Sequence, residues 1–171
     1  MKEMKWAVLG TGVIANEMAQ ALNKNGRNIY AVANRTHEKA VDFAKKYNIA
    51  KVYDDMNDVF TDPEVDVIYI TTPHNTHIEF MKKAIENGKH IVTANKELLA
   101  KKGEELFNLA EKHNRVVLYE AAIAGGIPII MPIKTILAGN KINKIQAILN
   151  GTTNYILTKM AVDGASSEDV L

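Results

Sequence analysis

The chain has 171 residues, of which 47% are hydrophobic and 24% are charged, and these proportions are typical of a folded globular protein. Its formal net charge is +1 and no long basic run occurs, so we expect no nucleic acid and no membrane surface as a partner. The chain contains no cysteine, which excludes disulfides, thiolate metal sites and cysteine nucleophiles. The first apolar stretch is too short for a signal peptide or a membrane span, and a cytoplasmic protein is expected.

Short apolar runs alternate with amphipathic segments over the first 120 residues. The apolar runs predict strands, which are expected over 6–9, 29–33, 51–53, 65–70, 90–93 and 116–119. The amphipathic segments predict helices: one ends near Asn25-Gly26, one is capped by Thr36, one covers 55–60, one ends at Asn87-Gly88 and one covers 98–113. Strands that alternate with helices predict an α/β fold with a doubly wound parallel sheet of the Rossmann type. The first domain is therefore expected to cover residues 1–120.

The pattern changes after residue 120, where glycine and alanine become frequent. The elements expected beyond this point are an apolar helix over 129–137, a strand with one solvated face over 142–149, a helix over 152–160 after the turn signal Asn150-Gly151, and a helix that starts at Ser166. Residues 121–171 are therefore predicted to be the beginning of an α+β domain, which would bind substrate or mediate dimerisation.

A glycine-rich turn joins the first expected strand to the first expected helix. Its sequence, Gly10-Thr11-Gly12-Val13-Ile14-Ala15, has the spacing of a dinucleotide-binding turn. Gly10 permits the tight turn, and Gly12 lets the backbone approach a pyrophosphate, which would lie over the amino terminus of the helix. We predict cofactor contacts along this turn, from Gly10, Thr11, Gly12, Val13 and Ile14. The alternative is a pair of glycines that serve only the turn.

The end of the second strand distinguishes NADP from NAD. An NAD site usually places Asp or Glu there to bind the ribose hydroxyls, whereas an arginine accommodates a 2′-phosphate. This chain has Asn34-Arg35-Thr36 and no acid, so Arg35 offers a guanidinium and Thr36 adds a donor. NADP is favoured over NAD, and the competing interpretation is a solvated arginine beside a helix cap.

A polar segment, Thr71-Thr72-Pro73-His74-Asn75-Thr76-His77, follows the fourth expected strand. In open α/β sheets, ligands bind at the carboxyl ends of the strands. We therefore predict cofactor contacts from Thr71, Thr72, Pro73, Asn75 and His77. His77 is also a candidate proton relay, because imidazole titrates near neutral pH. The alternative is a capped helix start with exposed histidines.

Lys96 follows the fifth expected strand, in the segment Val92-Thr93-Ala94-Asn95-Lys96. A lysine at this edge of the sheet can contact the cofactor ribose, the substrate or the transferred proton. We therefore predict that Lys96 is both a catalytic and a cofactor-binding residue, and an ordinary surface lysine is the alternative.

Residues 4–90 resemble the amino-terminal domain of the glucose-fructose oxidoreductase/inositol dehydrogenase (Gfo/Idh/MocA) family. The similar stretches are 5–12, 31–36, 62–66 and 72–77. The resemblance implies that the glycine turn, the Asn-Arg pair and the Thr-Pro-His segment line an NADP or NAD site. It also implies a sugar or diol dehydrogenase, although the substrate-side aspartate and histidine motif of that family has no match in this chain.

From about residue 90 onward the chain resembles homoserine dehydrogenase, through the stretches 92–96, 119–128 and 150–157. This resemblance implies hydride transfer between NADP(H) and homoserine or aspartate semialdehyde, with Lys96 at the cofactor and substrate. It further implies a site for a monovalent cation such as sodium, formed largely by backbone carbonyls at Glu120, Ile123, Gly125 and Ile127. A glycine-rich loop suits a cation with oxygen ligands, and a loop that merely closes against the sheet is the alternative.

The two resemblances meet near Gly88 to Val92, and three functions stay open: a homoserine dehydrogenase, a sugar or diol dehydrogenase, and a non-catalytic dinucleotide-binding module. The catalytic aspartate and lysine of homoserine dehydrogenases, with their substrate-binding glutamate, would follow Leu171, so little or no turnover is expected from this chain. Exposure of apolar side chains after residue 120 would favour association, and a homo-oligomer, most simply a dimer, is expected.

Overall fold

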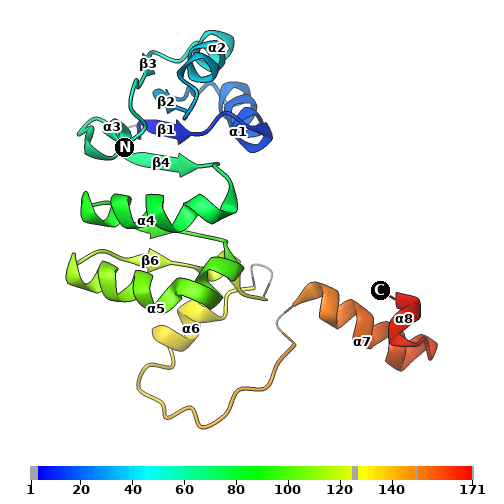
Figure 1. Ribbon diagram of the computed structural model, residues 1–171. Helices are drawn as coiled ribbons and strands as arrows, with labels where there is room; N and C mark the ends of the chain where they lie inside the picture. Colours follow the sequence, from blue (N-terminus) through cyan, green and yellow to red (C-terminus); the bar gives the residue numbers. More distant parts are fainter. Residues whose placement is uncertain (1–3, 125–126, 149, 171) are drawn as a thin grey trace. The chain divides into compact units, whose positions relative to one another are not determined.

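The computed structural model describes residues 4–124, 127–148 and 150–170 (Figure 1). The chain divides into two compact units, Met1–Lys89 and His90–Leu171. Each unit is described in turn.

The first unit contains a four-stranded parallel sheet in the order β3-β2-β1-β4. Its strands are β1 (Trp6–Leu9), β2 (Ala31–Ala33), β3 (Lys51–Val52) and β4 (Val67–Ile70). Val8 of the central strand pairs with Val32 on one side and Tyr69 on the other. Because consecutive side chains of β1 point to opposite faces and Ala7, Val8 and Leu9 are all fully buried, both faces of the sheet are covered there.

The helices of the first unit connect these strands. They are α1 (Val13–Lys24), α2 (His37–Tyr47), the short α3 (Asp58–Thr61), a 3₁₀ turn η1 (His74–Thr76) and α4 (His77–Glu86). Helices α1 and α2 pack over β1 and β2, where Ala15, Ala19 and Phe43 share one core cluster with Val8 and Val32. This packing fixes the turn between β1 and α1 against the start of α2.

The second unit begins with a parallel pair of strands, β5 (Ile91–Val92) and β6 (Val117–Leu118), joined by α5 (Lys96–Lys112). Helix α5 buries Leu98, Leu106 and Ala110, so this βαβ segment has an apolar core of its own. Four elements follow: a 3₁₀ turn η2 (Glu120–Ala122), α6 (Ile130–Lys134), α7 (Gly151–Asp163) and α8 (Ser167–Val170).

Most expected elements are confirmed, but the strand expected over 142–149 is wrong wherever the structure describes it. Residues 142–148 form no strand, and Leu149 lies outside the described residues. Ile142, Ile145 and Ile148 are 43%, 62% and 53% exposed. The apolar side of this alternating segment is therefore not buried. A strand needs a neighbouring strand to complete its hydrogen bonds, and the described residues offer this segment none.

Smaller differences concern the ends of elements. The strands expected over 29–33 and 65–70 are shorter, and α7 extends beyond the helix expected over 152–160. Among the helices that the structure describes, none combines the length and apolar character that a membrane span requires.

Candidate functional site

The turn between β1 and α1 requires glycine at its first position. Gly10 has φ +104°, and a Cβ there would lie 2.8 Å from Oγ1 and 3.2 Å from the carbonyl oxygen of Thr71. The turn is tied to both neighbouring strands, because Gly10 N donates to Ala33 O at 2.8 Å and Thr71 N donates to Leu9 O at 2.9 Å. The close approach of β4 therefore excludes any side chain at Gly10.

The second glycine leaves the start of α1 open. Gly12 is the N-cap of α1 with extended backbone and no side-chain cap, and no atom lies within 4 Å of where its Cβ would be. Val13 and Ile14 are 73% and 51% exposed, and the first turn carries no acid. The first N–H groups of a helix have no partner within the helix. This end of α1 therefore has the properties of an anion site.

Asn34, at the end of β2, connects this strand to the glycine turn. Its Nδ2 donates to Thr11 Oγ1 at 2.5 Å, and its Oδ1 accepts from Thr36 N at 2.9 Å. Thr36 is the N-cap of α2, as expected, but its side chain makes no cap hydrogen bond. Arg35 is exposed, and its side chain has no partner in the part of the chain that the structure describes.

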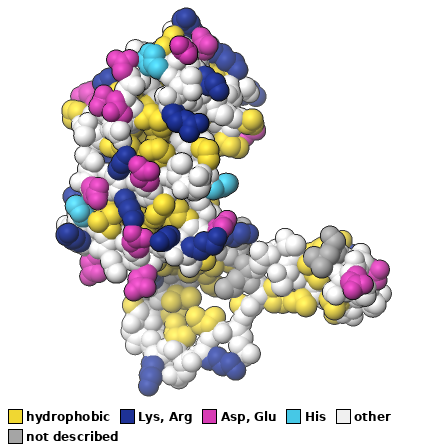
Figure 2. Space-filling model, viewed as in Figure 1, with side chains coloured by type: hydrophobic (Ala, Val, Ile, Leu, Met, Phe, Trp, Pro, Cys, Tyr) yellow, Lys and Arg dark blue, Asp and Glu magenta, His cyan; other side chains and the backbone are white. Residues whose placement is uncertain are grey.

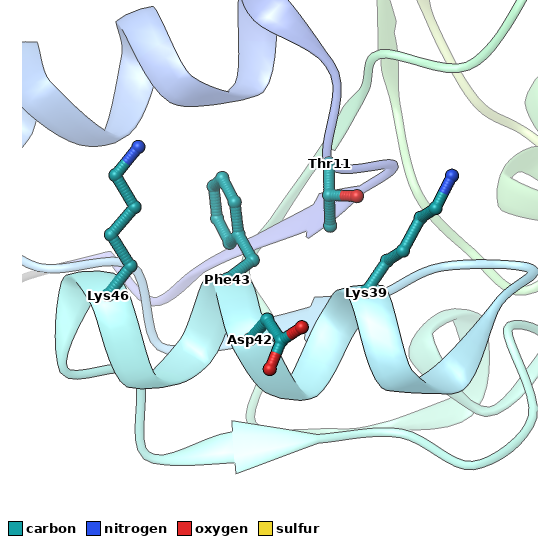
Figure 3. A pocket seen from close by; sticks show the side chains of 5 residues that line it. All are labelled: Thr11, Lys39, Asp42, Phe43 and Lys46. Carbon is teal, nitrogen blue, oxygen red and sulfur yellow. The ribbon is translucent and has the colours of Figure 1, made fainter.

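A pocket of about 260 Å³ opens between Thr11 and one face of α2 (Figure 3). Its lining is Thr11, Lys39, Asp42, Phe43 and Lys46. Figure 3 shows Phe43 facing Thr11, with Lys39 and Lys46 on either side. Lys39 was not expected at the site from the sequence; it lies in the first turn of α2, three residues after the N-cap Thr36.

The segment after β4 is held by its own hydrogen bonds. Thr76 Oγ1 lies 2.8 Å from Thr72 Oγ1 and 2.7 Å from Pro73 O, while Thr71 Oγ1 donates to Leu9 O at 3.1 Å. His77 Nε2 lies 2.7 Å from Thr72 O, and because a carbonyl can only accept, Nε2 carries the hydrogen. A proton relay through His77 would therefore have to use Nδ1. Asn75 lies in η1, next to this bonded group.

Lys96 lies in the second unit as the first residue of α5, four residues after β5 ends at Val92. Asn95 caps this helix, because its Oδ1 accepts from Leu98 N at 3.1 Å. Lys96 itself is exposed. Its position at the carboxyl end of a parallel strand is the one expected from the sequence.

The side chain of Glu120, in the loop expected to bind a cation, is held by the backbone of α6. The Glu120 carboxylate accepts hydrogen bonds from the backbone N–H groups of Ile129, Ile130 and Met131 at the start of α6. Burial raises the pKa of Glu120, but these hydrogen bonds outweigh it and leave the pKa below its ordinary value. No group of three or more His, Asp or Glu side chains suited to a metal occurs among the residues described here.

The other expected cation-site residues are partly described. Ile123 N donates to Glu120 O at 3.3 Å, and Ile127 N donates to Ala124 O at 3.2 Å. Ile127 is 64% exposed, and Gly125 lies outside the described residues. Among the described residues of this group, Glu120 is thus the only one that forms hydrogen bonds through its side chain, whereas Ile123 and Ile127 form them through the backbone.

The protein family that matches most of this chain has the fold indicated by the parallel sheet and its glycine turn. The model of the "Oxidoreductase family, NAD-binding Rossmann fold" matches residues 4–121. The chain belongs to this oxidoreductase family. The homoserine dehydrogenase model matches residues 128–171. Both resemblances seen in the sequence are confirmed, and the first extends to residue 121 instead of ending near residue 90.

Individual relatives of this chain are homoserine dehydrogenases. The enzyme of Pseudomonas aeruginosa is 38% identical and that of Neisseria gonorrhoeae 42% identical, each over the whole of this chain. The chain spans only 41% of the length of either relative. The similarity therefore runs through both halves of the chain, including the first 90 residues.

Solved structures agree with the Rossmann fold. A homoserine dehydrogenase from Thiobacillus denitrificans matches with a TM-score of 0.70 and 35% identity, over 99% of this chain and 41% of that chain. GenD2 from gentamicin A biosynthesis, solved in complex with NAD, matches with a TM-score of 0.58 over 70% of this chain and 34% of its own. Its identity of 20% shows the fold alone.

Proposed function

We propose that this chain binds NADP(H) for a homoserine dehydrogenase reaction, the transfer of a hydride between the nicotinamide and homoserine or aspartate semialdehyde. Similarity to homoserine dehydrogenases over the whole chain supports this reaction. The observation that carries the choice of cofactor is the pair of exposed cations after β2: Arg35, which follows Asn34, and Lys39, which lines one pocket with Thr11. When bound, the nicotinamide supplies the hydride acceptor for the hydroxyl-bearing carbon of homoserine.

The glycine turn fits a pyrophosphate. The exposed backbone at Gly12 and the first N–H groups of α1 can donate to phosphate oxygens, and the helix dipole adds to this attraction. No acidic side chain of the first turn opposes the anion. Thr11, held by Asn34, lies between this turn and the pocket on α2.

The cations after β2 fit a 2′-phosphate. Arg35 and Lys39 are exposed, and neither side chain has a partner among the residues that the structure describes. Arg35 can form two parallel hydrogen bonds to a phosphate, and Lys39 adds a second positive charge in the first turn of α2. An acid that would bind the ribose hydroxyls of NAD is missing directly after β2.

Cofactor titrations test this choice. We expect Arg35→Ala to weaken NADPH binding about tenfold to a hundredfold, because a charge-assisted contact is lost, and to leave NADH binding nearly unchanged. Lys39→Ala should act in the same direction with a smaller effect. Arg27→Ala is the matched control, because Arg27 is exposed and precedes β2 instead of following it. Equal losses for NADPH and NADH in Arg35→Ala would exclude the 2′-phosphate contact.

The substrate is tested with the same protein. Any reduction of NADP⁺ by this chain, however slow, is expected to require homoserine and not to occur with myo-inositol. Reduction with myo-inositol alone would identify a diol dehydrogenase, and cofactor binding that responds to neither compound would identify a dinucleotide-binding module. Lys96→Met is expected to remove any such homoserine-dependent activity while the fold is retained, since Lys96 is proposed to contact the cofactor and substrate.

Residues 1–120 are proposed as the dinucleotide-binding domain and residues 121–171 as part of a substrate or dimerisation domain. The limits of the two family matches, at 121 and 128, support this division. A cytoplasmic homo-oligomer, most simply a dimer, belongs to the same proposal. Sedimentation equilibrium of the purified chain measures the oligomeric state, and a monomer at all concentrations would contradict it.

A monovalent cation such as sodium is proposed at the carbonyl groups of the loop that starts at Glu120. The Glu120 carboxylate would hold this loop through the backbone of α6 and would not be a ligand itself. A higher melting temperature in sodium chloride than in choline chloride of equal ionic strength is the expected result. Identical melting temperatures in the two salts would exclude the cation.

A further inference from the structure

Asn16, in the first turn of α1, uses its side chain to hold the glycine turn. Its Nδ2 donates to Gly12 O at 2.9 Å and lies 3.3 Å from Thr11 O. Its Oδ1 accepts from Lys46 Nζ at 2.9 Å and from the Tyr47 hydroxyl at 2.8 Å. An asparagine amide has two donor hydrogens and an oxygen with two lone pairs, so this side chain is fully engaged.

The two bonds on Nδ2 help to fix the direction of the peptide groups that form the turn: Gly12 O also accepts the helical hydrogen bond from Asn16 N at 3.1 Å, whereas, among the described residues, Nδ2 alone reaches Thr11 O. A trans peptide is planar, and its N–H points away from its C=O. Because the carbonyls of Thr11 and Gly12 point to Asn16, the N–H groups of Gly12 and Val13 point the opposite way. These are N–H groups at the open start of α1, where an anion would bind.

The two bonds on Oδ1 attach the turn to a rigid part of the first unit. Tyr47 is 7% exposed and belongs to the core cluster beneath α1 and α2, and its ring lies 4.8 Å from that of Phe43. Gln20 lies one turn after Asn16 on α1, and its Nε2 donates to the Tyr47 hydroxyl at 3.4 Å. The orientation of Asn16 is therefore set by the packing of α2.

We propose that Asn16 is a positioning residue for the pyrophosphate of the dinucleotide. It acts through the backbone of Thr11 and Gly12, and it orders the N–H groups before the cofactor binds, which lowers the entropy lost on binding. The inference rests on the proposed dinucleotide site, but not on the choice between NADP and NAD, since both contain the same pyrophosphate.

Comparing the binding of ligands with and without a pyrophosphate distinguishes a positioning role of Asn16 from a general structural role. We expect Asn16→Leu to weaken NADPH and NADH binding equally, by about tenfold, and to leave 2′-AMP binding unchanged. 2′-AMP contains the adenine and the 2′-phosphate but no pyrophosphate. Tyr47→Phe keeps the ring and removes one bond to Oδ1, so it should give a smaller loss of the same kind. Asn23→Leu, at an exposed position of α1, is the matched control.

The outcomes are distinct, and calorimetric titration measures all three ligands. Unchanged NADPH and NADH affinities in Asn16→Leu would overturn the proposal, and so would a parallel loss of 2′-AMP binding, because it would indicate damage to the whole site. A chain that binds NADH as tightly as NADPH would contradict the proposed NADP preference. The Asn16 proposal would still be decided by the affinities of Asn16→Leu for both cofactors. A chain that binds neither would overturn both proposals.

Discussion

The apolar side chains of residues 4–89 and of residues 127–170 have different surroundings. In the first region, Val8, Val32 and Ile85 are fully buried, and both faces of β1 are covered. In the second region, helices α6, α7 and α8 contain no buried residue, and Ile136 and Val162 are 78% and 77% exposed. Figure 2 shows hydrophobic side chains on the surface of this second region.

The difference shows which elements need a core. Helix α7 extends over Gly151–Asp163 without a buried side chain, because its hydrogen bonds join residues four positions apart. Residues 142–148 have the alternating pattern of a strand and form none. Strands form their hydrogen bonds with other segments, so an alternating sequence is not sufficient without a neighbour.

The largest effect is expected from removing matched isoleucines in the two regions. Ile85→Ala should lower the free energy of unfolding by about 2–5 kcal/mol, because it leaves a cavity in a packed core. Ile136→Ala should change it by less than about 0.5 kcal/mol, because Ile136 is exposed. Urea denaturation measures both, with fluorescence of Trp6 in β1 reporting on the first unit and circular dichroism on the whole chain.

A large loss in Ile136→Ala would show that the apolar side chains of the second region are covered in solution. Sedimentation of the same variant would then separate a second copy of the chain from another cause. A shift toward monomers together with the loss of stability would show that a second copy of the chain covers these apolar side chains.

The next largest effect is expected at Asp62, a buried acid of the first region. Asp62 is 7% exposed, and its Oδ2 accepts from Lys51 Nζ and from the Tyr53 hydroxyl, both at 2.6 Å. Its Oδ1 accepts from Glu64 N at 2.8 Å. The bonds from Lys51 and Tyr53 hold the pKa of Asp62 at about 2, below its ordinary value of 3.8. Burial, and then the bond to this carboxylate, raises the pKa of Tyr53.

Asp62→Ala should lower the free energy of unfolding by about 3 kcal/mol at neutral pH, since it leaves Lys51 and buried Tyr53 without their acceptor. Because the pKa of Asp62 is lower in the folded state, its contribution is complete above about pH 4 and is lost as the pH falls toward 2. The variant should therefore show a smaller acid-induced loss of stability than the parent. Urea titrations between pH 6 and pH 2 measure this difference.

Asp54→Ala is the control, because the Asp54 side chain is 97% exposed. We expect almost no change in stability and an acid dependence like that of the parent. An Asp62→Ala variant with the parent's acid dependence would show that other groups determine stability at low pH.

Sequence patterns predicted those parts of the fold that depend on local chemistry. The strand over 6–9 and the helix ends at Asn25-Gly26 and Asn87-Gly88 appear where expected, because apolar runs and turn residues act on their own neighbourhood. The glycine turn was predicted for the same reason. Asn16 was not, because its partners Lys46 and Tyr47 lie about thirty positions away on α2.

The residues of the site that depend on packing were harder to predict. Lys39 became visible only when α2 placed it in the same pocket as Thr11. Glu120 was expected at a cation site formed largely by backbone carbonyls, and the hydrogen bonds of its carboxylate to the start of α6 were not expected. Both outcomes depend on which segments meet in space, and neither residue type nor spacing determines that.

The smallest effect is expected at two helix caps that differ only in what the helix packs against. Asn95 Oδ1 accepts from Leu98 N at 3.1 Å at the start of α5, and Asn150 Oδ1 accepts from Thr153 N at 3.0 Å at the start of α7. Replacing an asparagine cap by alanine costs about 1 kcal/mol. Helix α5 has a buried face that keeps it folded after this loss, whereas α7 has none and is as short as the helices that are only marginally stable alone.

Asn150→Ala should therefore speed amide exchange throughout α7 by about fivefold, the ratio that corresponds to 1 kcal/mol. Asn95→Ala should affect only the first turn of α5, because Leu98, Leu106 and Ala110 still anchor the helix. Hydrogen exchange resolved by residue distinguishes the two responses. If both variants lost protection only in the first turn, α7 would have to be stabilised by packing in solution, and the contrast between the two regions would be smaller than their exposures indicate.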